Sequence, residues 1–288
     1  MIPASFEYFN PQTLDEAISL LEQYGDDAKI MSGGHSLIPM MKLRLANPEY
    51  IIDINDIPGL SYIREEGGFL KIGALTREAE LEHSELIKSK YHIFCDATKV
   101  IADPQVRNRG TIGGNLAHGD AANDHPAIML AMNAQIVIQG PQGSRTVPMT
   151  DFMLGFYQTA IEHAEILTEI QIPIPPQGSG GAYLKLERKV GDYATAGVAV
   201  QVTIENNTFK KVGIGLTNVS PVPVKVTDAE SHLTGKTISD QIIQEAAQMA
   251  SDASSPSPDL RGSEEYKRAM VRVLTQRAIR RAIEDAQG

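Results

Sequence analysis

Hydrophobic residues follow helical spacing near the start of the chain and strand-like patterns soon after it. Four apolar positions share one face of a predicted helix: Ala17, Leu20, Leu21 and Tyr24. Thr13 and Glu16 precede them as a capping-box pattern. Short apolar strands are predicted at residues 28–31 and 50–54, with a helix between them at residues 37–45. The N-terminal part is therefore expected to mix strands and helices.

The middle of the chain alternates between strand and helix patterns. Turn residues at 55–59 indicate a subdomain break, and a hairpin with strands at 60–65 and 69–73 follows them. Thr76 is interpreted as the cap of the next helix. Helices are then expected through residue 89 and at 93–101 and 127–132, and strands at 135–138, 144–148 and 165–172. A Pro- and Gly-rich segment at 173–181 indicates a linker.

The last third of the chain places strands before helices. Three strand candidates at 182–189, 194–205 and 211–217 suggest an antiparallel sheet, and helices are predicted at 239–253 and 264–286. Five arginines lie along the final helix: Arg268, Arg272, Arg277, Arg280 and Arg281. Such a run is more often a solvated, ion-paired face than a docking surface.

Composition narrows the class of protein. With 42% hydrophobic residues, the 288-residue chain can bury one large core or two smaller ones. The net charge of −10 disfavours nucleic acid as a partner. No apolar run is long enough to span a bilayer and the N-terminus lacks signal-peptide features, which predicts a cytoplasmic protein. The single cysteine, Cys95, leaves no ligand set for an iron–sulfur cluster and is interpreted as a small core residue.

Two glycine-pair loops carry the candidate chemistry. Ser32-Gly33-Gly34-His35-Ser36 and Thr111-Ile112-Gly113-Gly114-Asn115 each flank paired glycines with polar side chains. Loops of this kind can direct backbone N–H groups at an anion such as a pyrophosphate. Taken singly, each is also compatible with an ordinary turn. Neither matches the dinucleotide fingerprint G-x-G-x-x-G or the P-loop, so an NAD site or a kinase is not indicated.

Four segments together resemble a known family, the FAD-binding or medium subunits of molybdenum-containing hydroxylases, and are most similar to its carbon monoxide-oxidising members. They are residues 33–39, 103–107, 111–115 and 189–194. The resemblance implies an α+β chain. Residues 1–177 would form an α/β FAD-binding domain of the vanillyl-alcohol-oxidase-like (PCMH) type, with subdomains 1–57 and 58–177. Residues 178–288 would form a C-terminal domain with a three-stranded antiparallel sheet and a helical bundle.

The same resemblance implies a set of FAD-binding residues. Ser32, Gly33, Gly34, His35 and Ser36, together with Thr111, Ile112, Gly113, Gly114 and Asn115, would hold the pyrophosphate through backbone N–H groups and hydroxyls. Asp124 resembles an acidic residue that binds the flavin nucleotide, and Lys185 a basic residue near the ring. Tyr193 would lie against the isoalloxazine ring, with Ile101 and Leu167 as apolar contacts.

Three of these residues have structural alternatives. Asp124 also stands where it could cap the following helix, since it immediately precedes His125 and Pro126. Lys185 could face water from a strand, and Tyr193 could be a core tyrosine. No catalytic residue and no metal ligand is expected in this chain.

The function that the resemblance implies is electron transfer. An iron–sulfur small subunit carrying 2Fe-2S clusters and a large subunit carrying a molybdenum-pterin cofactor would be partners, in a dimer of heterotrimers. Carbon monoxide and water would become carbon dioxide in the large subunit, and electrons would pass through FAD to a quinone. The alternatives are an aldehyde- or heterocycle-oxidising relative, a stand-alone flavin oxidoreductase, or a non-catalytic nucleotide-binding module. Association with the inner face of the cytoplasmic membrane is left open.

Overall fold

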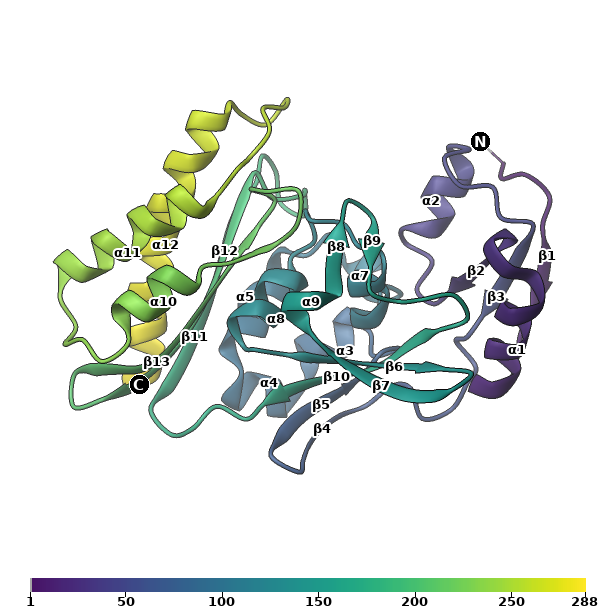
Figure 1. The fold of residues 1–288 in the computed structure, drawn as a ribbon, viewed down its shortest axis with the longest axis horizontal. Coiled ribbons are helices and arrows are strands. Elements are labelled where there is room, and N and C mark those ends of the chain that lie inside the picture. The colour runs from purple at the N-terminus through teal and green to yellow at the C-terminus, as the bar shows by residue number, and fades with distance from the viewer. Residues whose placement is uncertain (1) are drawn as a thin grey trace.

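The computed structural model describes residues 2–288, in which three larger sheets and one two-stranded sheet form (Figure 1). The first is a parallel sheet in the order β1-β3-β2. Its elements are β1 (Glu7–Phe9), α1 (Leu14–Tyr24), the 3-10 turn η1 (Gly25–Asp27), β2 (Ala28–Met31), α2 (Leu37–Lys42) and β3 (Tyr50–Asp53). Thr13 caps α1 by accepting a hydrogen bond from the Glu16 N–H, and the chain leaves the helix at Gly25 with φ 60°. These local signals place β2 so that it runs directly into the first glycine loop.

The second sheet is antiparallel, in the order β4-β5-β10-β6-β7. Its strands are β4 (Ile63–Glu66), β5 (Phe69–Gly73), β6 (Gln135–Gly140), β7 (Gly143–Pro148) and β10 (Ile166–Pro173). Between these strands in the chain lie the helices α3 (Glu78–His83), α4 (Glu85–Lys90), α5 (His92–Val100), α6 (Pro104–Arg107), α7 (Ile112–Ala117), α8 (His125–Ala131) and α9 (Met149–Phe152). A small hairpin of β8 (Met153–Gly155) and β9 (Gln158–Thr159) follows α9. Alternating burial in β6 and β10 points one face of the sheet into the central core.

The C-terminal part is an antiparallel sheet, β11-β12-β13-β14, packed against helices on both faces. It comprises β11 (Ser179–Leu186), β12 (Ala196–Glu205), β13 (Thr208–Thr217), β14 (Val224–Lys225), α10 (Thr227–Leu233), α11 (Asp240–Ala253) and α12 (Glu264–Gln287). A Cβ at Gly213 would lie 1.8 Å from the Ala131 carbonyl oxygen of α8, so glycine is needed for this close approach. Helix α12 packs against the sheet from its other side, where Gly180 faces Ala286. The sheet therefore joins the middle of the chain to the C-terminal helices.

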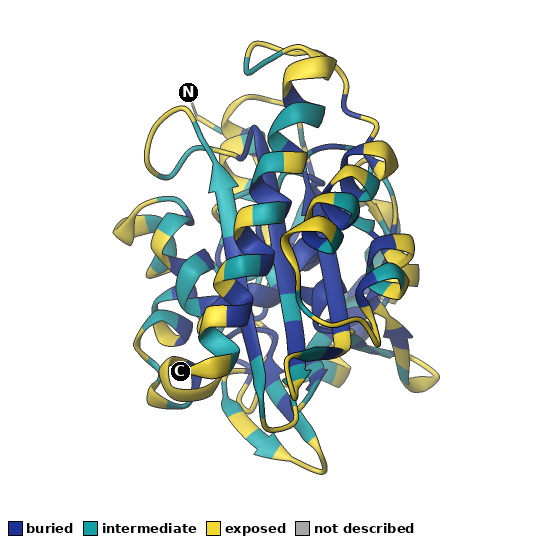
Figure 2. Cartoon of the chain, turned by 90° about the vertical axis from the view of Figure 1, so that its left-hand side faces the viewer, coloured by how far each residue is buried: buried dark blue, intermediate teal, exposed yellow. Residues whose placement is uncertain are grey.

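Seen from the C-terminal side, the strands are mostly buried beneath helices whose outer faces are exposed (Figure 2). Three arginines of α12 form ion pairs: Arg268 with Glu264 at 3.1 Å, Arg280 with Asp240 at 2.9 Å, and Arg281 with Asp96 of α5. This agrees with the predicted ion-paired face. Within residues 2–288, no helix combines the length and apolarity needed to cross a bilayer.

Several predicted element boundaries are wrong. Thr76 does not cap α3, because its hydroxyl is buried and hydrogen-bonds the Tyr62 backbone; Arg77 is the N-cap residue. The linker is shorter than predicted, since β11 begins at Ser179. The C-terminal sheet gains a fourth strand, the two-residue β14, and α10 was not predicted. Cys95 is half-buried at the edge of the core rather than inside it.

Candidate functional site

A cleft of about 800 Å³ lies where the N-terminal sheet, the middle part and β11 meet. This volume falls in the upper part of the range typical of ligand pockets, about 300–1,000 Å³. Fourteen of the fifteen predicted site residues line it: Ser32, Gly33, Gly34, His35, Ser36, Ile101, Thr111, Gly113, Gly114, Asn115, Asp124, Leu167, Lys185 and Tyr193. The cleft thus gathers segments from distant parts of the sequence around one space.

The first glycine loop presents free backbone donors to the cleft. The N–H groups of Gly33, Gly34, His35 and Ser36 find no acceptor within residues 2–288. Gly34 has φ +74°, a left-handed conformation that favours glycine. The His35 ring shares a hydrogen bond through Nδ1 with the Gly33 carbonyl at 2.9 Å, which fixes the loop. Successive free N–H groups in such a loop form a concave site for an anion.

In the second glycine loop, the backbone N–H groups that the sequence suggested as ligand donors already have acceptors within the protein. The N–H groups of Ile112 and Gly113 donate to the carbonyls of Thr76 and Ala74, at 3.0 and 2.9 Å. Those of Gly114 and Asn115 are taken by the Thr111 hydroxyl and carbonyl. Backbone donation from these four residues to a ligand, as predicted, is therefore not supported, because the donors are already used.

Hydroxyl and amide side chains remain available at the second loop. The hydroxyls of Ser32 and Thr111 lie 3.0 Å apart and join the two loops. A Cβ at Gly114 would lie 2.8 Å from both hydroxyl oxygens. Asn115 also lines the cleft, and its buried amide oxygen has no hydrogen-bond partner in the described chain.

Two predicted residues of this loop serve packing. Ile112 is fully buried in the central core and is not among the residues that line the cleft. Gly113 lines the cleft, but a Cβ there would lie 2.6 Å from the Ala74 carbonyl oxygen. Glycine is required at 113 because β5 continues into a segment that touches α7.

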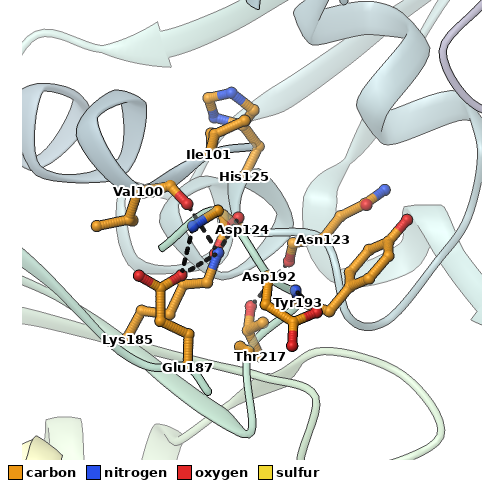
Figure 3. Close-up of polar contacts among 12 residues, drawn as sticks. Val100, Ile101, Asn123, Asp124, His125, Lys185, Glu187, Asp192, Tyr193 and Thr217 are labelled. Atoms are coloured by element: carbon orange, nitrogen blue, oxygen red, sulfur yellow. Dashed lines mark hydrogen bonds and ion pairs between the residues drawn. The ribbon is translucent and has the colours of Figure 1, made fainter. Parts of the chain in front are cut away.

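Asp124 and Lys185 form a buried ion pair at 3.1 Å (Figure 3). The side chain of Lys185 is only 2% exposed, so the water-facing alternative is wrong. Its ammonium also donates to the Val100 carbonyl at 3.0 Å and lies 3.6 Å from Glu187. Asp124 is the N-cap residue of α8, yet its side chain makes no capping bond and instead accepts from Lys185 and the Tyr183 hydroxyl. The capping alternative is therefore also wrong.

Burial sets the electrostatics of this pair. Removal from water raises the pKa of the Asp124 carboxyl, and the neighbouring Lys185 ammonium and Tyr183 hydroxyl oppose that rise. Burial and the Asp124 charge raise the pKa of Tyr183 well above its ordinary value, so its hydroxyl stays protonated and donates. Tyr183 was missed because a strand tyrosine carries no local sign of a polar partner.

A second buried pair, His125 and Glu78, lies beside Asp124. His125 Nε2 lies 2.8 and 2.9 Å from the two carboxylate oxygens of Glu78, and both side chains are almost fully buried. Burial lowers the pKa of His125, but the Glu78 and Asp124 carboxylates outweigh it and raise the pKa overall. Sequence patterns gave no sign of this contact, which ties the start of α3 to the start of α8.

Tyr193 lies in the cleft wall and is 45% exposed, so it is not a core tyrosine. Asp192 accepts from the Tyr193 N–H and forms ion pairs with Arg188 and Arg261, which hold this loop. Ile101 and Leu167 line the cleft as nearly buried apolar side chains. This end of the cleft offers aromatic and apolar surface beside the buried ion pair.

The arrangement suits a long ligand with an anionic middle and a flat, partly polar end. Free N–H groups and paired hydroxyls lie in one stretch, and Tyr193 lies near Asp124 and Lys185 in another. Within the part of the chain that the structure describes, no three His, Cys, Asp or Glu side chains group as a metal site.

Comparisons with known proteins cover nearly the whole chain. The family model described as "FAD binding domain in molybdopterin dehydrogenase" matches residues 4–175, and that of the CO dehydrogenase flavoprotein C-terminal domain matches residues 181–282. The chain is 49% identical to the carbon monoxide dehydrogenase medium chain of Hydrogenophaga pseudoflava and 45% identical to that of Afipia carboxidovorans, each match covering 98% of both proteins. A solved carbon monoxide dehydrogenase from Hydrogenophaga pseudoflava, lacking the Mo-pyranopterin moiety, contains a chain with TM-score 0.97 and 48% identity, covering 99% of both chains.

Proposed function

The chain belongs to the FAD-binding subunits of molybdopterin dehydrogenases, and from this premise we propose that it is the FAD-carrying electron-transfer subunit of a carbon monoxide dehydrogenase. The observation that carries this proposal is the 49% identity to a carbon monoxide dehydrogenase medium chain across 98% of both proteins. Residues 1–177 would form the FAD-binding domain, and residues 178–288 the C-terminal domain.

Three observations of this structure fit FAD. The cleft has room for an extended dinucleotide, the free N–H groups of residues 33–36 provide an anion site, and the Asn115 amide oxygen lacks a partner. FAD, when bound, supplies the capacity to accept and pass on electrons. We assign the binding of its pyrophosphate to the first loop's N–H groups and the hydroxyls of Ser32 and Thr111.

The remaining residues orient and shield the ring system. Lys185 provides a buried positive charge held in place by Asp124, and such a charge favours the reduced, more negative form of a flavin. Tyr193 presents an aromatic face, and Ile101 and Leu167 exclude water. No side chain here is assigned to bond-making chemistry.

The partners follow from the same proposal. An iron–sulfur small subunit with 2Fe-2S clusters would deliver electrons from a molybdenum large subunit, where carbon monoxide and water become carbon dioxide. The electrons would pass to a quinone, and the assembly would be a dimer of heterotrimers. We place it in the cytoplasm, where contact with the inner membrane face would give access to the quinone.

The experiment is to purify the chain with its bound partners and to assay carbon monoxide-dependent reduction of a quinone analogue. The proposal predicts turnover with carbon monoxide and none with aldehydes or N-heterocycles. Turnover with one of those substrates instead of carbon monoxide would move the chain to another branch of the family.

A further inference from the structure

Tyr157 occupies an unusual position beside the cleft. It is the second residue of the two-residue turn that joins β8 and β9, and it is 45% exposed. Its neighbour Phe156 is 67% exposed. Tyr157 lines the cleft, whereas Phe156 does not. Tyr157 therefore faces the site, whereas Phe156 lies outside the cleft and packs edge-on against the Tyr157 ring, with the ring centroids 4.2 Å apart.

The backbone of Tyr157 is strained in order to hold this position. Its φ is +55°, a left-handed conformation that is an outlier for a bulky side chain and that glycine or asparagine would adopt more easily. Strain of this kind persists only where surrounding contacts enforce it, and it concentrates at ligand sites.

Three consecutive residues enforce the conformation. The His118 ring packs against the Tyr157 ring with centroids 4.9 Å apart. The Gly119 carbonyl accepts from the Tyr157 N–H at 3.0 Å, and Asp120 accepts from its hydroxyl at 3.4 Å. The ring, the backbone N–H and the hydroxyl of Tyr157 each have a partner, and these three contacts together fix the orientation of its side chain.

The same segment connects Tyr157 to the Tyr193 end of the cleft. Asn218 donates its backbone N–H to the Ala121 carbonyl at 2.9 Å and its side-chain amide to the Ala194 carbonyl. Ala121 follows Asp120, and Ala194 follows Tyr193. Burial raises the pKa of Tyr193, and the Asp120 carboxylate and the Tyr157 hydroxyl lie near enough to raise it further. The two tyrosines thus belong to one end of the cleft.

We propose that Tyr157 is a cofactor-binding residue whose ring, together with Tyr193, walls the aromatic end of the cleft and retains the isoalloxazine ring of FAD. This inference rests on the proposed function. An exposed, rigid aromatic face at a cavity is suited to a planar ligand, and the backbone strain is maintained because that face must point into the cleft.

The test compares variants in the purified assembly. Tyr157→Gly and Tyr157→Asn remove the ring but suit the left-handed backbone, so neither should lower thermal stability. Both should speed FAD release on dilution by about 3- to 10-fold, the range expected from loss of one aromatic contact. Tyr157→Phe keeps the ring and should stay within about twofold of wild type, on the same grounds.

Leu154→Ala is the matched control, because it removes an exposed apolar side chain from β8 of the same hairpin that does not line the cleft. It should leave FAD release unchanged. FAD release from Tyr157→Gly and Tyr157→Asn at the Leu154→Ala rate would overturn this inference alone. A wild-type assembly without FAD would overturn the proposed function itself, so the two failures are distinguishable.

Discussion

Replacing Lys185 by methionine tests the buried ion pair that braces the cleft. The variant keeps much of the side-chain volume but removes the ammonium that contacts Asp124 at 3.1 Å and the Val100 carbonyl at 3.0 Å. Because the Lys185 side chain is 2% exposed and that of Asp124 9%, water cannot easily replace the lost partner. Removing one member of a buried pair typically destabilises by about 3–5 kcal/mol. We expect a loss of that size at neutral pH.

The loss should depend on pH in a defined direction. Without Lys185, the folded-state pKa of Asp124, already raised by burial, rises further. A carboxyl with a raised folded pKa favours folding when protonated, and this contribution is lost as pH rises through the folded pKa. The deficit relative to wild type should therefore be largest at neutral pH. It should shrink on acidification by up to about 1.4 kcal/mol per pH unit.

The assay is denaturant unfolding of the purified full chain, followed by circular dichroism at several pH values. Lys189→Met is the control, since this lysine is exposed, and it should change stability by no more than about 0.5 kcal/mol. The double variant with Asp124→Asn should recover much of the loss, because no unpaired charge remains. A Lys185→Met variant as stable as the control at neutral pH would refute the reasoning.

Three further variants test the other walls of the cleft. Gly114→Val should abolish FAD binding yet leave the fold largely intact, because its Cβ would meet the Ser32 and Thr111 hydroxyls rather than backbone; stoichiometric FAD in that variant would remove Gly114 from the site. Tyr193→Ala should retain FAD but alter its reduction potential or oxygen reactivity, and an unchanged flavin on both measures would exclude the assigned contact. Burial lowers the pKa of His118, so its contribution to stability is present above about pH 6.5 and is lost as pH falls through the folded pKa. His118→Gln should therefore lose less thermal stability than wild type on acidification, and identical pH profiles would contradict this assignment.

Local signals in the sequence predicted most regular elements. The Thr13 cap and the helix after it, the hairpin of β4 and β5 and the alternating strand β10 all form near their predicted places. The family resemblance and the α+β fold class are confirmed by the comparisons. These predictions succeeded because they depend on local residue patterns or on motifs that are visible in a single sequence.

Errors arose where a tertiary contact decided the outcome. Thr76 has a capping side chain, but its hydroxyl is used by the backbone of Tyr62, 14 residues earlier. The N–H groups of Ile112 and Gly113 are consumed by Thr76 and Ala74, so this loop could not be assigned as a backbone anion site from its glycines. Sequence spacing does not reveal which distant carbonyl will occupy a donor.

In the candidate site, too, the residues could be predicted from the sequence, whereas the contacts between them could not. Resemblance placed Asp124 and Lys185 in the site, but their mutual contact and the support from Tyr183 emerge only when side chains of β11 reach the N-cap residue of α8. The strained turn at Tyr157 likewise has no signal in the sequence, because tyrosine is not a residue expected at a left-handed position.

The most direct test of the account is anaerobic addition of carbon monoxide to the purified assembly while the flavin absorbance is recorded. We expect one FAD per copy of this chain, bleached by carbon monoxide in the wild type, and no flavin signal from the assembly that carries Gly114→Val. An assembly whose FAD stays oxidised under carbon monoxide, although a chemical reductant bleaches it, would contradict the assignment of this chain to carbon monoxide oxidation.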